Sequence, residues 1–246
     1  RDQMKFITSI SVPVAWRRQY CGIFEAKIGS VIYYLIDNQY YFKRHGLYGH
    51  FDDAERFAFF SRAILEMLPY IDFKPDVIHT NDWQTALVPV YYRLFYANNE
   101  WYSGIKTLFT IHNIQYQGQY GKEILEDVFG IPNYESSLLE FGGDVNLMKG
   151  AIECANWVST VSPTYAQEIL DPWFSHGLDG LLRQKQYKTC GILNGIDVDV
   201  STPPPTPTSS RTTMSTPSRT ARRSARRPCR MNRPAQRRQP IMAMIT

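Results

Sequence analysis

The sequence predicts an α/β protein in which a parallel sheet, covered by helices on both faces, is followed by a disordered tail. Two observations predict this fold class. Short segments rich in Val, Ile and Leu alternate with segments of helical periodicity over residues 30–193, a pattern typical of buried parallel strands joined by helices. From residue 201 onward the chain is rich in Pro, Ser, Thr and Arg and has no aromatic residue, a composition that cannot form a packed core.

The expected elements follow one another in a regular order. Strands are predicted at 30–37, 76–79, 106–111, 157–161 and 190–193. Helices are predicted at 52–71, 83–96, 162–170 and 177–184, and near 122–129 and 144–155. Asp52 and Glu55 have capping-box spacing at the start of the first helix, and Pro89 predicts a kink in the second. Ser162 followed by Pro163 is a typical helix start.

Charge is divided unevenly along the chain. Residues 201–246 contain 10 Arg and no Lys, Asp or Glu, so residues 1–200 hold 17 basic and 23 acidic residues. Because the body is acidic and the end is basic, the overall charge says little about partners. A nucleic-acid partner is not expected, although a basic nucleic-acid-binding tail is an alternative function for the end of the chain. No apolar run reaches the roughly 18 residues of a membrane span, and no signal peptide is recognised. Four widely spaced cysteines favour a reduced, cytoplasmic protein.

Polar side chains follow four of the predicted strands. The residues concerned are 79–82, His112 with Asn113, Ser162, and 194–197. In a parallel sheet, ligands bind at the carboxyl ends of the strands. Because these strand ends are expected to share one edge of the sheet, the sequence predicts a site for a polar small molecule there.

Other ligand chemistries lack their sequence signals. No GxGxxG or GxSxG motif follows a strand, and no GxxxxGK[ST] phosphate loop is present. The Asp-x-Asp at 197–199 is too common a pattern to indicate a metal, and no metal is predicted. Amide, imidazole and hydroxyl groups instead match the hydroxyls of a carbohydrate, whose apolar face would be covered by Trp83, Tyr116 and Tyr120.

Five segments, in this order and spacing, carry a family resemblance: HTNDWQTALVPVYY, TLFTIHNIQYQG, VSTVSPTYAQEI, GLDGLL and GILNGID. Together with LYGHFDDAERFAFFSRAILE, they resemble the N-terminal domain of bacterial glycogen (starch) synthases over residues 1–200. The resemblance implies the N-terminal half of a GT-B fold, which has two Rossmann-like domains. It also implies a retaining glucosyltransferase that moves glucose from ADP-glucose to the non-reducing end of an α-1,4-glucan without a further cofactor.

The resemblance implies a role for each candidate site residue. His112 would lie beside the transferred glucose, with its backbone carbonyl near the anomeric carbon, where it would stabilise an oxocarbenium-like transition state. Asp82 would be a cleft carboxylate that orients substrate hydroxyls. The substrate-binding residues would be Asn113, Tyr116, Asn194 and Gly195. Two simpler alternatives are that Asp82 caps the following helix and that Asn194 only turns the chain.

The sequence departs from the family pattern toward both ends. The family's first strand, with its Lys-x-Gly-Gly-Leu turn, and its cationic C-terminal domain are not found, so residues 1–200 are expected to be an incomplete acceptor-side domain that is inactive alone. Residues 201–240 fit a shifted reading frame, and residues 241–246 resemble a remnant of the first strand of the C-terminal domain. A non-catalytic glucan-binding module and another retaining sugar-nucleotide glycosyltransferase are the alternatives.

Overall fold

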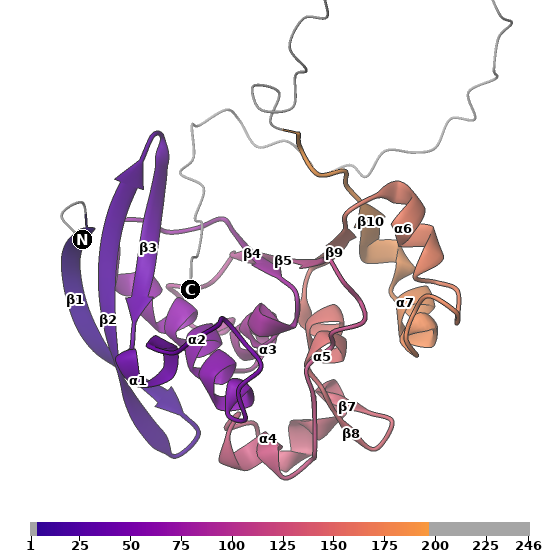
Figure 1. Cartoon of the computed structure of the whole chain (residues 1–246), viewed down its shortest axis with the longest axis horizontal. Helices are drawn as coiled ribbons and strands as arrows, with labels where there is room; N and C mark the ends of the chain where they lie inside the picture. The colour runs from indigo at the N-terminus through magenta and orange to yellow at the C-terminus, as the bar shows by residue number, and fades with distance from the viewer. Residues whose placement is uncertain (1–3, 197–246) are drawn as a thin grey trace, which may run out of the picture.

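The computed structural model of the chain describes residues 4–196 (Figure 1). The predicted disordered tail (201–240), the predicted strand remnant (241–246) and the Asp-x-Asp at 197–199 lie outside the described residues. Within residues 4–196, every helix is too short or too polar to cross a membrane.

A four-stranded parallel sheet forms the centre of the fold, as the sequence predicts. Its strand order is β10-β9-β5-β4. The strands are β4 (Val77–Asn81), β5 (Lys106–Ile111), β9 (Trp157–Thr160) and β10 (Thr189–Gly191). β4 continues two residues beyond its predicted end at His79, so that Asp82 rather than Thr80 is the first residue after the strand.

Helices pack against this sheet and bury most of the apolar side chains. The longer ones are α2 (Asp53–Met67), α3 (Leu87–Tyr91), α5 (Leu147–Cys154), α6 (Pro163–Glu168) and α7 (Asp179–Gln184). α2, α3 and α5 lie together below the sheet in the view of Figure 1, whereas α6 and α7 lie beside β10. Fully buried core residues include Phe59, Ile64, Leu65, Leu87, Phe109, Ile111 and Ile152.

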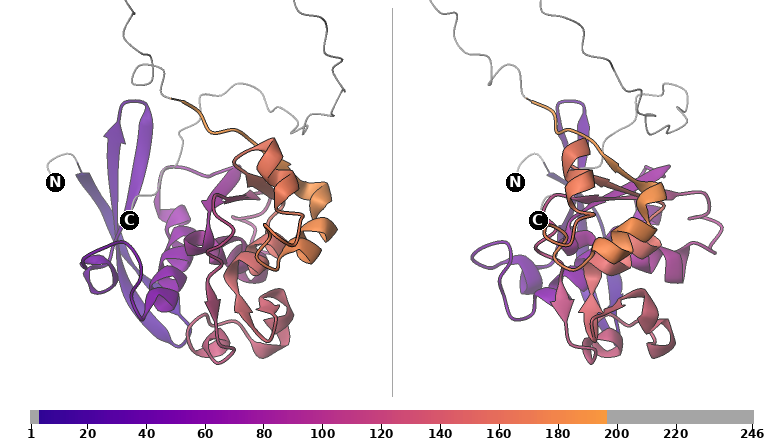
Figure 2. Two further views of the ribbon diagram at one scale, coloured as in Figure 1. Left: turned by 45° about the vertical axis from the view of Figure 1, so that its right-hand side comes forward. Right: turned by 90° about the vertical axis from the view of Figure 1, so that its right-hand side faces the viewer.

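The N-terminal part forms a separate sheet that the sequence analysis did not predict. β1 (Met4–Val14), β2 (Arg17–Ile28) and β3 (Val31–Asp37) pair in an antiparallel meander. α2 packs against β1, and the meander stands on the opposite flank of the molecule from α6 and α7 (Figure 2). The predicted strand at 30–37 therefore exists, but it is not part of the alternating parallel arrangement. The strands of a sheet with one solvent-exposed face alternate apolar and polar residues. β1 and β2 accordingly lack the continuous apolar runs expected of parallel strands.

Smaller elements make up the rest of the described secondary structure. α1 (Gln39–Phe42) and α4 (Ile124–Asp127) are single turns. A second antiparallel sheet has the strand order β6 (Gln119–Tyr120), β8 (Asp144–Asn146) and β7 (Glu140–Phe141). The helical prediction near 144–155 is therefore wrong for its first three residues, because β8 precedes the helix. Short 3₁₀ turns occupy Leu68–Tyr70, Trp83–Thr85, Asn133–Leu138 and Gln186–Lys188.

Three predictions about helix ends have different outcomes. The Ser162 hydroxyl caps α6 by accepting the Tyr165 N–H at 2.9 Å, as predicted. The capping box is wrong, because the Asp52 carboxylate pairs with Arg44 at 2.7 Å and makes no cap hydrogen bond. Pro89 lies in the first turn of α3, where a backbone N–H would have no helical partner, and the irregularity follows it as a π turn at Tyr92–Tyr96.

Candidate active site

Asp82 has a strained backbone at the carboxyl end of β4. Its φ of 55° and ψ of −176° lie in a region that is nearly restricted to glycine and costs about 1–3 kcal/mol for other residues. Two hydrogen bonds hold this conformation: the Asp82 N–H donates to the Thr110 carbonyl at 3.0 Å, and the Thr85 N–H donates to the Asp82 carbonyl at 3.2 Å. Strain that is stabilised from both sides in this way is typical of functional sites.

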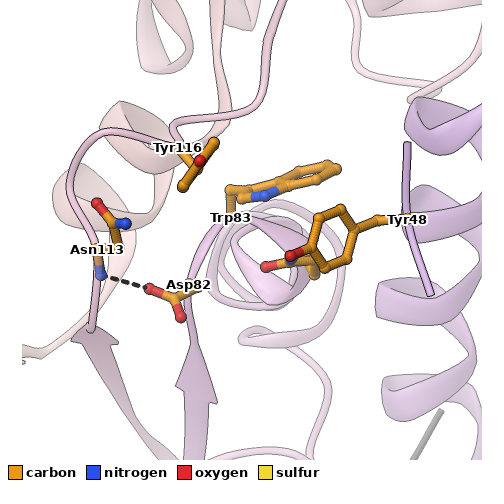
Figure 3. A pocket seen from close by; sticks show the side chains of 6 residues that line it. Tyr48, Asp82, Trp83, Asn113 and Tyr116 are labelled. Atoms are coloured by element: carbon orange, nitrogen blue, oxygen red, sulfur yellow. Dashed lines mark hydrogen bonds between the residues drawn. The ribbon is translucent and has the colours of Figure 1, made fainter. Parts of the chain in front are cut away.

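The Asp82 carboxylate holds the start of the loop that follows β5. Its Oδ1 accepts the backbone N–H of His112 at 2.8 Å. The same oxygen accepts the backbone N–H of Asn113 at 3.3 Å (Figure 3). It makes no cap hydrogen bond to the 3₁₀ turn after it. The alternative in which Asp82 only caps a helix is therefore wrong, and the side chain connects two neighbouring strand ends.

The imidazole of His112 is held by β4 as well. Its Nε2 lies 3.0 Å from Oδ1 of Asn81, the last residue of β4. The Thr85 hydroxyl in turn fixes Asn81, accepting its N–H and donating to its carbonyl, each at 2.7 Å. Asp82 and Asn81 thus position the backbone and the ring of His112 separately.

Three hydrogen-bonded polar side chains form a row across β4, β5 and β9, at the level of Thr110, two residues before His112. His79 Nε2 lies 2.6 Å from the Thr110 hydroxyl, which lies 2.6 Å from the Ser159 hydroxyl of β9. Burial, and next the charge of His112, lower the pKa of His79 below its ordinary value. The sequence analysis did not single out Thr110 or Ser159, although their positions inside predicted strands were an available signal.

The loop after His112 is built on buried hydrogen bonds. Asn113 Oδ1 accepts the Gln115 N–H at 3.0 Å, which closes a tight turn. The buried Gln117 donates from Nε2 to the carbonyls of Ile114 and His176, both at 3.1 Å, and accepts from Asn146 Nδ2 at 2.6 Å. The predicted site loop is therefore anchored to the start of α5 and to the segment before α7.

Gly118 ends this loop in a conformation that favours glycine. Its φ is 65°, and a Cβ would approach the Trp83 ring and the Leu147 side chain at 3.0–3.1 Å. Any larger residue here would displace Trp83, a side chain of the adjoining pocket.

A pocket of about 200 Å³ opens beside the Asp82 carboxylate. It is lined by Tyr48, Asp82, Trp83, Gln84, Asn113 and Tyr116 (Figure 3). Tyr48 and Tyr116 expose 62% and 58% of their surface, so aromatic faces are available to a ligand. The sequence analysis missed Tyr48, whose signal was its place in the LYGHFDDAERF segment that carries the family resemblance.

Four sequence-predicted residues do not line this pocket: His112, which lies beside it on the Asp82 carboxylate, Tyr120, Asn194 and Gly195. Tyr120 packs its ring edge-on against Phe129 at 6.2 Å and lies outside this pocket, so its contact with a sugar stays a prediction. Asn194 and Gly195 are exposed after β10, at the opposite edge of the sheet from β4. Three strand spacings, about 14 Å, separate these edges. No group of three or more metal-binding side chains occurs within residues 4–196.

Fold and site together define a class of protein. A parallel α/β sheet presents, at the carboxyl ends of β4 and β5, a carboxylate, an imidazole and an amide beside exposed aromatic rings. Such an arrangement is typical of α/β domains that bind a polar small molecule at the carboxyl ends of the strands. A family model described as the starch synthase catalytic domain matches residues 1–184, and the chain belongs to that family.

Individual relatives agree with this family. The chain is 51% identical over 205 residues to a glycogen synthase of Desulforamulus reducens, covering 82% of this chain and 43% of the relative. It is 49% identical over 203 residues to a glycogen synthase of Alkaliphilus metalliredigens, with the same coverage. The chain thus spans less than half the length of these curated relatives.

A solved structure has the same fold. The catalytic domain of starch synthase IV from Arabidopsis thaliana, bound to ADP and acarbose, matches with a TM-score of 0.72 and 35% sequence identity. The match covers 80% of this chain and 41% of that chain.

Proposed function

We propose that residues 1–200 are the acceptor-side part of a retaining glucosyltransferase, which moves glucose from ADP-glucose to the non-reducing end of an α-1,4-glucan. The observation that carries the proposal is the double hydrogen bond from the His112 and Asn113 N–H groups to Asp82 Oδ1, beside a pocket with aromatic walls. The glycogen synthase relatives and the ADP- and acarbose-bound starch synthase IV support the same substrates. A cytoplasmic location stays a prediction from the sequence.

The proposed reaction exchanges one glycosidic bond for another. The bond between glucose C1 and the diphosphate breaks, a bond from C1 to an acceptor hydroxyl oxygen forms on the same face, and the hydroxyl proton leaves with the diphosphate. The transition state carries positive charge near C1, which an aligned carbonyl dipole stabilises. In this proposal the His112 carbonyl supplies that dipole, its imidazole binds a sugar hydroxyl, and the bonds to Asp82 and Asn81 keep both in place.

The acceptor glucan would occupy the aromatic pocket. Glucose rings present apolar C–H faces, which pack against exposed aromatic side chains, and hydroxyls, which bind amides and carboxylates. Tyr48 and Tyr116 supply the first kind of contact, and Gln84 and Asn113 supply the second. ADP-glucose acts as a substrate in this reaction, and no cofactor or metal is required.

The pocket lacks a counterion for the leaving diphosphate. Its six lining residues within the described part of the chain include Asp82 but no Lys or Arg. Anionic leaving groups need cationic or N–H donors in the transition state. We therefore assign that role to parts of the longer relatives that this chain does not match.

A full-length version, in which this chain is extended to the length of its relatives, tests the proposal. Radiolabelled ADP-glucose is supplied with glycogen, and the product is digested from its non-reducing ends with an α-1,4-specific exohydrolase. Label that enters glycogen and is released by this digestion supports the proposal. Failure to incorporate glucose from ADP-glucose would contradict it, and transfer from a different sugar nucleotide would favour another retaining glycosyltransferase.

A non-catalytic glucan-binding module is a second candidate, favoured by the pocket's aromatic walls and lack of a cation. Both candidates bind glucan, so calorimetric titration of a full-length version with maltooligosaccharides separates them only together with the transfer assay. Glucan binding by a full-length version that never transfers glucose would favour the module.

A further inference from the structure

β4 and β5 carry two side-chain pairs with the same geometry. In the parallel register, His79 faces Leu108 and Asn81 faces Thr110. His79 bonds to Thr110 and Asn81 bonds to His112, so each contact joins a β4 residue to the residue two places beyond its β5 partner. Side chains two apart lie on the same face of a sheet, and diagonal neighbours are within reach of long side chains. The position of the His112 ring is therefore a consequence of strand register.

The contact with Asn81 determines which ring nitrogen of His112 carries the proton. An amide oxygen only accepts hydrogen bonds, so the His112 Nε2 that lies 3.0 Å from Asn81 Oδ1 must be the donor. In a neutral imidazole the other nitrogen is then an acceptor. Nδ1 is left with a lone pair for a sugar hydroxyl.

We propose that Asn81 is a positioning residue for the transfer reaction, which fixes the rotation and the tautomer of His112 so that Nδ1 accepts a hydrogen bond from a sugar hydroxyl. This inference rests on the proposed function. Asn81 does not line the pocket and acts through His112. The Thr85 hydroxyl holds the Asn81 backbone on both its N–H and its carbonyl, so the amide has a rigid base.

The titratable groups around His112 are few. His79 and Asp82 approach from β4 and its end, and Tyr165 of α6 accepts the N–H of Ile114 in the same loop. Asp82 contacts the His112 backbone rather than its ring. Among these described neighbours, Asn81 is the partner of the ring itself, and a charge placed at position 81 acts on the imidazole directly.

The first test measures the His112 imidazole without using activity. The chain is labelled with ¹⁵N-histidine, and His112 is titrated by NMR in the parent, in Asn81→Asp and in Gln186→Glu. A carboxylate in contact with the ring favours its charged form, so Asn81→Asp is expected to raise the His112 pKa by about one unit or more. Gln186→Glu adds the same charge in an exposed turn beside β10, where salt screens it at distances beyond about 8 Å. Equal His112 pKa values in the two variants would show that the side chain at position 81 does not contact the imidazole.

The second test measures transfer in a full-length version. Asn81→Leu removes the oxygen, and misplacement of a catalytic group by about 1 Å can cost roughly 100-fold, so kcat is expected to fall by about that factor with little change in KM. Asn81→Asp keeps the oxygen and is expected to recover most of kcat above the raised His112 pKa. An Asn81→Leu protein with parental kcat would overturn the positioning role. If the full-length parent shows no transfer, the proposed function is contradicted. The NMR titration would still show whether the Asn81 side chain contacts the His112 ring.

Discussion

The backbone N–H of His112 donates to Oδ1 of Asp82 at 2.8 Å, across the ends of two adjacent parallel strands. The same oxygen accepts the N–H of Asn113 at 3.3 Å. A single carboxylate therefore sets the path of the loop that carries the candidate catalytic histidine. Asp82 makes these bonds from a backbone conformation that disfavours every residue except glycine.

Two substitutions at position 82 separate backbone strain from side-chain function. Asp82→Ala and Asp82→Gly both remove the carboxylate, but only glycine adopts the φ of 55° without strain. Asp82→Gly is therefore expected to be more stable than Asp82→Ala by about 1 kcal/mol, as measured by denaturant unfolding. Both variants are expected to lose turnover in a full-length version. Equal free energies of unfolding for Asp82→Ala and Asp82→Gly would contradict backbone strain at position 82.

His112→Ala is expected to lower turnover far more than stability. The imidazole is exposed, so its removal should change the free energy of unfolding by no more than about 0.5 kcal/mol. Loss of one group that stabilises developing charge typically costs about 100- to 1,000-fold in kcat. Glucose transfer by a full-length version and thermal melting of the same protein check both parts. A folded His112→Ala variant with near-normal turnover would show that His112 does not take part in the reaction.

Part of this site could be predicted from the sequence. An apolar strand that ends in His112 and Asn113 indicates a polar strand end, and the parallel pairing of β4 with β5 brings Asp82 to the same edge. The contact between Asn81 and His112 could not be predicted, because it depends on a strand register that no local pattern encodes. Nor could the strain at Asp82, because aspartate at positive φ is mostly in the left-handed helical region, whereas the ψ of −176° places Asp82 in a region nearly restricted to glycine.

The misses have similar physical causes. Asn194 follows the carboxyl end of β10, as expected, but the order of strands in the sheet could not be predicted from their order in the chain, and it places β10 three strands away from β4. Tyr48 lies between α1 and α2, in a segment without periodicity, and only the folded chain brings it to Trp83 in the pocket. The N-terminal meander was missed because its strands lack the continuous apolar runs of buried parallel strands, although alternation of polar and apolar residues was an available signal for half-buried strands.

The chain as given is expected to show no glucose transfer by itself. Its described pocket offers aromatic rings, amides and a carboxylate, but no cation for the departing diphosphate. Removal of even one donor from such a site costs about 100- to 1,000-fold. Labelled ADP-glucose and glycogen are incubated with the purified chain, and with a full-length version as the positive control. Robust incorporation by the chain alone would show that the essential groups lie within it.

Gln117→Leu is expected to destabilise the loop that carries His112. The substitution would leave Asn146 Nδ2 and the carbonyls of Ile114 and His176 without their partner in a buried site. Each unsatisfied buried group costs about 1–3 kcal/mol, so the loss should exceed 2 kcal/mol in denaturant unfolding. Gln119→Leu, at an exposed position two residues later, is the matched control. Similar losses in both variants would contradict the network.

His79 is expected to make stability fall as the pH is lowered. Burial, and then the charge of His112, lower its pKa in the folded chain, so the unfolded chain binds more protons at mildly acidic pH. The free energy of unfolding then rises with pH in the window from the lowered folded pKa up to the unfolded pKa of about 6.5. Above this window the stabilisation that comes from neutral His79 is complete.

Two variants test this dependence. His79→Gln removes it and keeps a polar side chain near Thr110, whereas His45→Gln changes an exposed loop residue. Denaturant unfolding at pH 7.5 and at pH 5 measures the difference. The decrease between these two pH values should be smaller in His79→Gln than in the parent and in His45→Gln, and an equal decrease in all three would mean that His79 titrates as freely in the folded chain as in the unfolded one.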